Sequence, residues 1–264
     1  MSFRDTYGPW ALVTGASAGL GLCFARELAH RRVDLILTAR RGERLEELAD
    51  ELREKERARV LVIPADLATE AGFAKIISAV KDLEIGLLVN NAGFGKTGPL
   101  ISITDRQLSE MIRLNCEMPV RLARALLPSM MRRRKGGMVM VASAAAYQPT
   151  PWMNVYGATK VFDLHFGEAA GVELEDHNVD VVTVSPGHTE TEFHERAGVS
   201  GSVTGKSASP EDVVKQTLQR LGHQRSFVHG WLNKAMTFSA RVFPRRWVAA
   251  IAGEMLGSRM ARKN

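Results

Sequence analysis

A tyrosine and a lysine four residues apart form a pair of side chains with a clear chemical use. Tyr156 and Lys160 fall in a stretch with a helical pattern, so their side chains share one face of a helix. Ser143 precedes Tyr156 by thirteen residues. A free phenol, with a pKa of about 10, exchanges protons poorly near neutral pH. We expect the Lys160 ammonium to lower the pKa of Tyr156, so that the phenol serves a substrate oxygen as general acid or base.

A glycine-rich segment near the N-terminus suits a phosphate group. It follows a short apolar run, Trp10–Thr14, and opens a stretch with a helical pattern. Its glycines permit a tight turn and let the backbone approach a pyrophosphate, whose charge suits a helix N-terminus. An ordinary strand-to-helix turn seldom needs three glycines at this spacing. The segment therefore predicts a dinucleotide site formed by Gly15, Ser17, Ala18, Gly19, Leu20 and Gly21.

The elements that must position these residues alternate along the first 190 residues. Short runs rich in β-branched residues are mostly apolar throughout, as expected for parallel strands covered on both faces. Longer helical patterns separate them, which predicts an α/β fold: a single domain with a Rossmann-like, doubly wound parallel sheet in three αβα layers. The expected strands are Trp10–Thr14, Asp34–Ala39, Val60–Ala65, Leu87–Asn90, Met138–Ser143 and Asp180–Ser185. The expected helices are Gly19–Arg31, Gly42–Lys55, Thr69–Lys81, Thr104–Arg134 and Trp152–Glu175, with a further one beginning at Ser209.

Further motifs follow these elements in order along the chain. They are Asp66-Leu67, Asn90-Asn91-Ala92-Gly93, Asn115, Ser143, Tyr156-x3-Lys160 and Pro186-Gly187. Together with the Gly-x3-Gly-x-Gly spacing of the glycine-rich segment, they resemble the short-chain dehydrogenase/reductase family in its single-domain form. The resemblance covers residue 8 to about residue 230. Many separate matches in the right order are far more specific than any one of them.

The resemblance implies a catalytic tetrad of Asn115, Ser143, Tyr156 and Lys160. Ser143 would hold the substrate oxygen, and Tyr156 would exchange a proton with it while the cofactor transfers a hydride. Lys160 would also hold the nicotinamide ribose, and Asn115 would anchor a water molecule that connects Lys160 to solvent. The positively charged nicotinamide ring would help to lower the pKa of Tyr156. No metal ion is expected.

The same resemblance implies further contacts to the nucleotide. Asp66 would accept a hydrogen bond from the adenine amino group, with help from the Leu67 backbone. The residues expected around the adenosine ribose are Asn91, Ala92 and Gly93, and those expected around the nicotinamide are Tyr156, Lys160, Pro186, Gly187, Thr189 and Thr191.

The end of the second strand indicates which nucleotide is bound. An NAD site places a carboxylate there to hold the ribose hydroxyls, whereas this strand ends in Ala39-Arg40-Arg41. An arginine can hold a 2′-phosphate through charge-assisted, forked hydrogen bonds. Arg40, with Arg41 as the weaker candidate, therefore predicts NADP(H) as the cofactor. The alternative is that both arginines merely solvate a helix start.

The composition indicates the class of protein and its expected cellular location. The chain has 264 residues, 45% of them hydrophobic and 24% charged, which is typical of a globular protein. Two cysteines far apart form neither a disulfide framework nor a zinc site. No apolar window is long enough to cross a membrane, and residues 1–10 lack the pattern of a secretory signal. These features predict a cytoplasmic protein.

The basic charge lies in residues 231–264, which hold seven basic residues and one acidic residue. Residues 1–230, the expected catalytic domain, are therefore neutral overall, which argues against a nucleic-acid partner. The segment 231–264 alternates bulky apolar with basic residues and resembles the C-terminal extension of hydroxysteroid- and ketoacyl-type members of the family. We expect it to pack over the substrate site or a neighbouring subunit of a homodimer or homotetramer. The alternative is peripheral contact with an anionic membrane.

The expected substrate is a small apolar carbonyl compound or alcohol, of aliphatic, aromatic or steroid-like character. This expectation rests on a pocket wall of Phe94, Tyr147, Trp152, Met153 and Phe193, with Ala197–Ser209 closing over it. The predicted function is therefore an NADP(H)-dependent oxidoreductase that interconverts a carbonyl and a secondary alcohol. One alternative is a catalytically silent nucleotide-binding regulator of the same fold. Another is an epimerase or dehydratase of the longer, sugar-nucleotide branch, whose glycine spacing differs.

Overall fold

Seven parallel strands form one sheet at the centre of the molecule. The computed structural model of the chain describes residues 2–189, 191–197 and 207–260, except for the side chains of 194–196 and 258–260. The strand order β3-β2-β1-β4-β5-β6-β7 confirms the predicted Rossmann-like, doubly wound fold. The seventh strand was not predicted, because three residues are too few to show a pattern. The strands are β1 (Trp10–Thr14), β2 (Asp34–Ala39), β3 (Val60–Pro64), β4 (Ile85–Asn90), β5 (Gly137–Val141), β6 (Asp180–Ser185) and β7 (Ser226–Val228).

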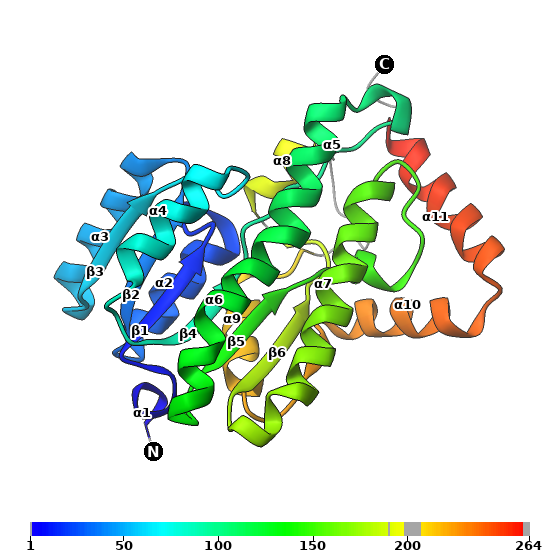
Figure 1. The fold of residues 1–264 in the computed structure, drawn as a ribbon. Coiled ribbons are helices and arrows are strands. Elements are labelled where there is room, and N and C mark those ends of the chain that lie inside the picture. Colours follow the sequence, from blue (N-terminus) through cyan, green and yellow to red (C-terminus); the bar gives the residue numbers. More distant parts are fainter. Residues whose placement is uncertain (1, 190, 198–206, 261–264) are drawn as a thin grey trace.

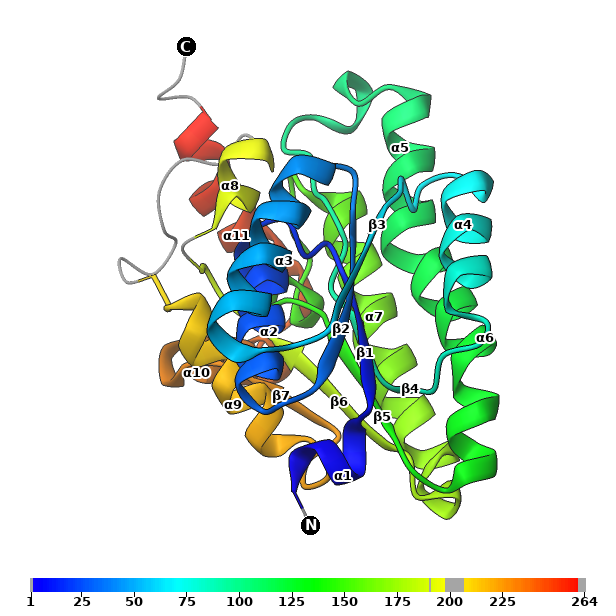
Figure 2. The same ribbon diagram turned by 90° about the vertical axis from the view of Figure 1, so that its left-hand side faces the viewer.

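Helices cover both faces of the sheet, as Figures 1 and 2 show from two sides. One face carries α2 (Gly19–His30), α3 (Gly42–Glu56) and α9 (Pro210–Arg220), and the other carries α4 (Glu70–Val80), α6 (Met118–Arg133) and α7 (Asn154–Glu173). Each helix buries an apolar stripe: on α3 the buried leucines are Leu45, Leu48 and Leu52, three or four residues apart. Two hydrophobic cores result, one on each side of the sheet.

The strand order places the loops that carry the predicted motifs at one edge of the sheet. Leu12 of β1 pairs with Ile36 of β2 on one side and with Leu88 of β4 on the other. The chain thus winds outward from β1 to β3 and then crosses back to β4, so the order reverses beside β1. Ligands of open α/β sheets bind at such a point, beyond the carboxyl ends of the strands.

The helix predicted over residues 104–134 is interrupted. Its start is confirmed, because Thr104 and Gln107 form a capping box at α5 (Asp105–Ile112). A π-helical turn, η2 (Arg113–Glu117), then separates α5 from α6, with the Met118 N–H bonded to the Arg113 carbonyl. Pro119 has no N–H to bond the carbonyl four residues earlier, which favours the wider turn.

The C-terminal helices pack at the carboxyl edge of the sheet. They are α8 (Glu192–Ala197), α10 (Trp231–Val242) and α11 (Arg245–Met260), and α10 contacts the short helix η3 (Ala144–Tyr147) that follows β5. Figure 1 shows α10 and α11 in orange and red, and the two helices contact each other. The remaining short helices are α1 (Phe3–Tyr7), η1 (Leu100–Ser102) and η4 (Glu175–His177). Within the described ranges, no helix is both long and apolar enough to cross a membrane.

Candidate active site

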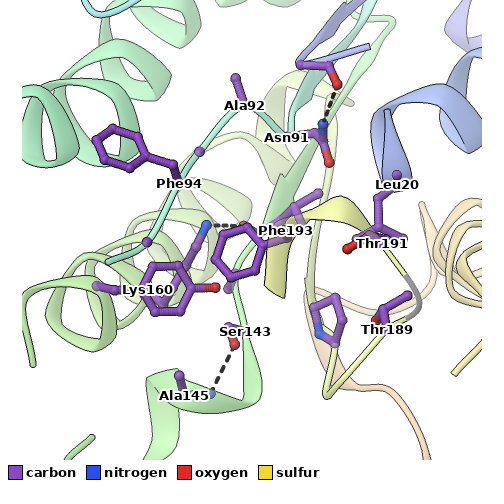
Figure 3. Close-up of a pocket in the computed structure, with 18 of the residues that line it drawn as sticks. Leu20, Asn91, Ala92, Phe94, Ser143, Ala145, Lys160, Thr189, Thr191 and Phe193 are labelled. Carbon is purple, nitrogen blue, oxygen red and sulfur yellow. Dashed lines mark hydrogen bonds between the residues drawn. The ribbon is translucent and has the colours of Figure 1, made fainter. Parts of the chain in front are cut away.

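A cavity of about 850 Å³ occupies the carboxyl edge of the sheet. It begins at the loop after β1, passes the ends of β4, β5 and β6, and ends against α10 and α11. Nearly all the predicted site residues line it, and Figure 3 shows several of them around the space. Among the predicted catalytic and nucleotide-binding residues, Gly21 and Asn115 are the exceptions, since neither lines the cavity.

The glycine-rich loop has the geometry that a pyrophosphate requires. Gly15 and Gly19 adopt φ angles of +68° and +55°, which favour glycine. Gly21 lies beneath the loop, where a Cβ atom would come within 2.3 Å of the Gly15 carbonyl oxygen. Ala18, at the N-cap of α2, has no side-chain acceptor for the first amides of the helix. Those amides can therefore bind an anion, so the loop fits the phosphates of a dinucleotide.

The end of β2 presents arginines to the cavity and no carboxylate. Arg40 is exposed at its rim, and Arg41 donates to the Ser17 hydroxyl oxygen at 3.1 Å. Glu192 of α8 accepts from Arg41 at 2.9 Å and from Arg44 at 2.5 Å. The rim of the cavity beside β2 therefore holds one exposed arginine, Arg40, and a second, Arg41, that is ion-paired with Glu192. Arg44 and Glu192 were not predicted, because α8 approaches α3 only in the folded chain.

The loops after β3, β4 and β6 complete the nucleotide end of the cavity. Asn91 donates to the Thr14 carbonyl oxygen at 2.8 Å and so ties the loop after β4 to β1. Asp66 accepts from the Ala68 N–H at 3.0 Å, and Thr191 lies against Gly19. The remaining predicted residues that line this end are Leu67, Ala92, Gly93, Pro186, Gly187 and Thr189.

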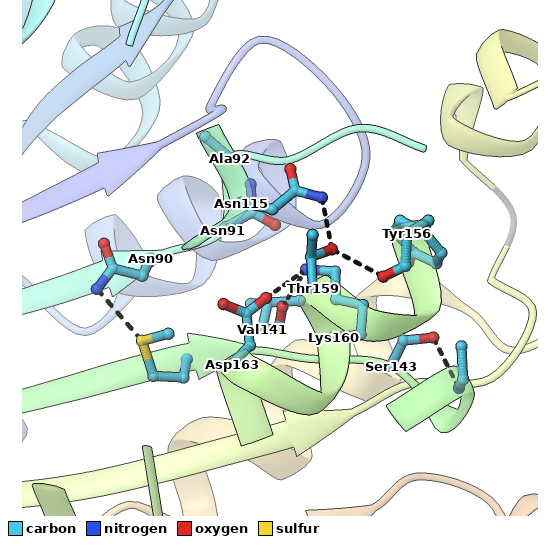
Figure 4. A network of polar contacts seen from close by, with 12 residues as sticks. Asn90, Asn91, Ala92, Asn115, Val141, Ser143, Tyr156, Thr159, Lys160 and Asp163 are labelled. Carbon is cyan, nitrogen blue, oxygen red and sulfur yellow. Dashed lines mark hydrogen bonds and ion pairs between the residues drawn. The ribbon is translucent and has the colours of Figure 1, made fainter. Parts of the chain in front are cut away.

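Ser143, Tyr156 and Lys160 converge in the middle of the cavity (Figures 3 and 4). The strand predicted to end at Ser143 stops at Val141, so Ser143 instead caps η3 and accepts from the Ala145 N–H at 3.2 Å. Tyr156 lies in the first turn of α7, close enough to Ser143 for that side chain to lower the pKa of its phenol. Lys160, one turn later, donates to the Val141 carbonyl oxygen at 2.8 Å.

Lys160 lowers the pKa of Tyr156, as expected, but in the protein without a ligand the net pKa of Tyr156 is above its usual value. Burial raises the pKa of Tyr156 and outweighs both the Lys160 ammonium and the Ser143 side chain, which lower it. A phenol that is largely buried loses part of the solvation that a phenolate needs. Tyr156 is therefore a protonated phenol near neutral pH, which is the form that donates a proton.

Asn115 sits in the π-helical turn and is buried. Its Oδ1 accepts from the Phe94 N–H at 3.1 Å, and its Nδ2 donates to the Thr159 hydroxyl oxygen at 3.0 Å. Asn115 thus joins the loop after β4 to α7. A Cβ atom on Gly93 would come within 3.1 Å of Asn115 Oδ1 and 3.7 Å of Lys160 Nζ, so both side chains converge on Gly93. The water-anchoring role of Asn115 stays a prediction.

The far end of the cavity is lined mainly by apolar side chains, with Asn233 and Thr237 among them, and differs in part from the predicted wall. Phe94, Met153 and Phe193 line it, and the centroid of the Phe193 ring lies 5.2 Å from that of the Tyr156 ring.

The other two predicted wall residues, Tyr147 and Trp152, do not line the cavity. Tyr147 lies beneath the Arg241 guanidinium, and Trp152 Nε1 donates to the Gly253 carbonyl oxygen at 3.0 Å. Both contact the C-terminal extension, which supplies the unpredicted lining residues Asn233, Met236, Thr237, Ala252, Met255 and Leu256. Of the closing segment Ala197–Ser209, residues 198–206 lie outside the described part of the chain.

Comparison with known proteins identifies the family of the chain. The profile of the family described as short chain dehydrogenase matches residues 9–200. A 7beta-hydroxysteroid dehydrogenase of Clostridium sardiniense is 30% identical over 256 residues, which are 97% of this chain and 98% of the relative. A solved structure of a 7beta-hydroxysteroid dehydrogenase superposes with a TM-score of 0.89 at 25% identity, covering 96% of this chain and 100% of that one. A short-chain dehydrogenase of Sphingobium yanoikuyae, solved in complex with NADPH, has a TM-score of 0.79 at 32% identity, over 89% of this chain and 94% of its own.

The chain therefore belongs to the short-chain dehydrogenase family. It is an oxidoreductase that acts on an alcohol or carbonyl group. A nicotinamide cofactor is typical of this family, and the glycine-rich loop, the arginines after β2 and the cavity fit such a group.

Proposed function

We propose that the protein is an NADP(H)-dependent oxidoreductase that interconverts a carbonyl and a secondary alcohol on an apolar substrate. One observation carries the proposal: Ser143, Tyr156 and Lys160 line a single cavity between a phosphate-binding loop and an apolar wall. A proton donor thus lies where a nucleotide and an apolar compound can meet.

The choice of NADP(H) rests on the end of β2. Ala39 lacks the carboxylate that would repel a 2′-phosphate, and Arg40 and Arg41 both line the cavity beside it. Arg41 is oriented by Ser17 and Glu192. An oriented guanidinium loses less freedom when it binds a phosphate. The NADPH complex of the Sphingobium yanoikuyae relative supports the same choice.

The proposed chemistry divides between cofactor and protein. A bound nicotinamide cofactor supplies or accepts the hydride. In the reductive direction Tyr156 gives its phenolic proton to the substrate oxygen, and in the oxidative direction it takes that proton back. Ser143 hydrogen-bonds the same oxygen and fixes its position. The Lys160 ammonium stabilises the negative charge left on Tyr156, which its burial would otherwise penalise.

The proposed substrate is an aliphatic, aromatic or steroid-like compound. Phe94, Met153 and Phe193 form one side of the apolar end, and α10 and α11 form the other. Apolar walls with few polar anchors favour such compounds over sugars or phosphorylated metabolites. The 7beta-hydroxysteroid dehydrogenase of Clostridium sardiniense matches nearly the whole chain, including the extension, and supports a substrate of this class.

The extension contributes to the substrate site through its inner face only. Its outer face exposes the large apolar residues Trp231, Phe238, Val242, Phe243, Trp247 and Ile251. The homodimer or homotetramer, and the alternative of membrane contact through residues 231–264, stay predictions for this outer face.

Titration of the purified protein with NADPH and NADH tests the cofactor. We expect NADPH to bind at least about tenfold more tightly, because one charge-assisted hydrogen bond contributes about 1.5–3 kcal/mol. Equal affinity for the two nucleotides would contradict the assignment. The Arg26→Ala variant, which changes an arginine of α2 paired with Glu51 outside the cavity, is the matched control and should keep the same preference.

A further inference from the structure

A buried carboxylate lies directly behind the site and has no part in the chemistry described so far. Asp163 follows Lys160 by three residues, so Tyr156, Lys160 and Asp163 occupy successive turns on one side of α7 (Figure 4). Asp163 is 2% exposed and does not line the cavity, whereas Lys160 does. Any effect of Asp163 on a bound molecule must therefore pass through Lys160.

The contact between the two side chains is a buried ion pair. Lys160 Nζ lies 2.9 Å from Asp163 Oδ2, and both side chains are nearly inaccessible to solvent. The other carboxylate oxygen, Oδ1, is buried and has no hydrogen-bond partner among the described residues. Such a carboxylate costs stability when it is placed in a core. Within the described structure, the Asp163 carboxylate therefore accepts a hydrogen bond from Lys160 alone.

The ion pair determines which donor hydrogens of Lys160 remain available to a ligand. An ammonium has three donor hydrogens. The Val141 carbonyl and Asp163 take two of them, both on the side of β5 and α7. The third remains for the cavity that Lys160 lines. The two inner contacts therefore hold Nζ in place for a ligand at the nicotinamide end.

We propose that Asp163 is a positioning residue that keeps Lys160 charged and aimed into the cavity, and so sustains nucleotide binding at alkaline pH. The proposal rests on the function proposed above, in which Lys160 holds the nicotinamide ribose. Burial alone lowers the pKa of Lys160, but the Asp163 carboxylate, together with Tyr156 and Cys116, more than offsets this and raises it. The other titratable groups that face the pair are Tyr156, on α7, and Cys116, on η2.

Neither Tyr156 nor Cys116 changes charge in the pH range that the test requires. The pKa of the Cys116 thiol is raised, chiefly by burial, to about 11, and the pKa of Tyr156 is also raised. Neither group titrates between about pH 7 and pH 9. A ribose 2′-phosphate, as a phosphate monoester, loses its second proton near pH 6 and keeps a constant charge in this window. A change in nucleotide affinity there reports on the Lys160–Asp163 pair, in which burial raises the pKa of Asp163 as well.

The experiment compares NADPH affinity in the wild type, Asp163→Asn and Asp34→Asn from about pH 7 to about pH 9. The Asp163→Asn change keeps the shape of the side chain and an acceptor oxygen but removes the charge. We expect Asp163→Asn to match the wild type within a few-fold at about pH 7 and to bind at least about tenfold more weakly at about pH 9. Asp34 is the matched control, because it is a buried carboxylate ion-paired with Arg59 at the opposite edge of the sheet. Asp34→Asn should follow the wild type at every pH.

Two results would overturn the proposal. One is an Asp163→Asn protein that follows the wild type at every pH, and the other is a loss of affinity that is equal at both ends of the range. If the wild type itself fails to bind NADPH, it is the proposed function that fails instead. Should Asp163→Asn not fold, NMR of lysine-labelled wild-type protein decides, with Lys160→Met used for assignment. Lys160 must then remain an ammonium to at least as high a pH as the exposed Lys81, and earlier deprotonation contradicts the proposal.

Discussion

The two ends of the cavity are built in different ways. At the nucleotide end, the lining residues come from the loops that follow β1, β2, β3, β4 and β6, and each loop carries a local sequence motif. At the substrate end, the wall combines α7, α8, α10 and α11, which are distant in sequence. The nucleotide end recognises a fixed cofactor with backbone geometry, whereas the substrate end uses replaceable apolar side chains. Changes at the first should therefore alter which nucleotide binds, and changes at the second should alter which substrate reacts.

The largest effect on turnover is expected at Tyr156, where the two ends of the cavity meet. Tyr156→Phe removes the proton donor but keeps the ring that packs against Phe193. Turnover should fall by about 10²- to 10⁴-fold, while NADPH affinity stays within a few-fold of the wild type. Steady-state kinetics and nucleotide titration measure the two quantities. Tyr7→Phe is the control, because Tyr7 donates to Asp180 away from the cavity. A Tyr156→Phe protein that retained most of its activity would show that the assigned mechanism is wrong.

A change confined to the nucleotide end should reverse the cofactor preference. The double variant Ala39→Asp/Arg40→Leu supplies a carboxylate for the ribose hydroxyls and removes one phosphate partner. We expect NADPH to bind roughly 10- to 100-fold more weakly, and NADH to become the preferred nucleotide. The ranking of ketone substrates should not change. If the double variant still prefers NADPH, the preference must come from Arg41 and Arg44, which are both ion-paired with Glu192.

A change confined to the substrate end should leave the nucleotide unaffected. Met236 lines the cavity and Phe238, two residues later on α10, is exposed on the outer face. Met236→Ala should lower kcat/KM for a bulky apolar ketone by about tenfold, through lost apolar contact, with NADPH affinity unchanged. Phe238→Ala should leave both quantities as they are. If the two variants behave alike, the inner face of the extension does not form the substrate wall.

The smallest effect is expected at the amino edge of the sheet, remote from both ends of the cavity. Burial raises the pKa of Asp34, but hydrogen bonds from Arg59 and Arg4 more than offset this and hold it below its usual value. A lowered pKa in the folded state stabilises the fold above the unfolded-state value of about 4, and the stabilisation is lost as the pH falls through the folded-state pKa. Urea unfolding should therefore show wild type more stable than Asp34→Asn at neutral pH, with the difference shrinking below about pH 4. A difference that is independent of pH would exclude this ion pairing as its source.

The same contrast explains what the sequence could predict. The strands are apolar runs and the glycine-rich loop is contiguous, so the sheet and the nucleotide end were predicted nearly residue by residue. The π-helical turn at Asn115 was not predicted, because the helical pattern of the sequence continues through it. The role of Asp163 was not predicted either, because a carboxylate three residues after a lysine commonly forms an ion pair at the surface. Only the folded chain shows that Asp163 is buried. The inner face of the extension was expected over the pocket, but Met236 and Met255 could not be told from its exposed apolar residues by sequence alone.

The most direct measurement is oxidation of NADPH by the purified protein in the presence of a panel of carbonyl compounds. The panel should run from bulky apolar ketones, steroid-like ones included, through small aldehydes to sugars, with NADH in parallel and Tyr156→Phe as the blank. We predict turnover with NADPH that is fastest for bulky apolar ketones and falls to the blank rate for sugars. Tight binding of NADPH with no turnover of any compound would contradict this account and would favour a catalytically silent nucleotide-binding regulator.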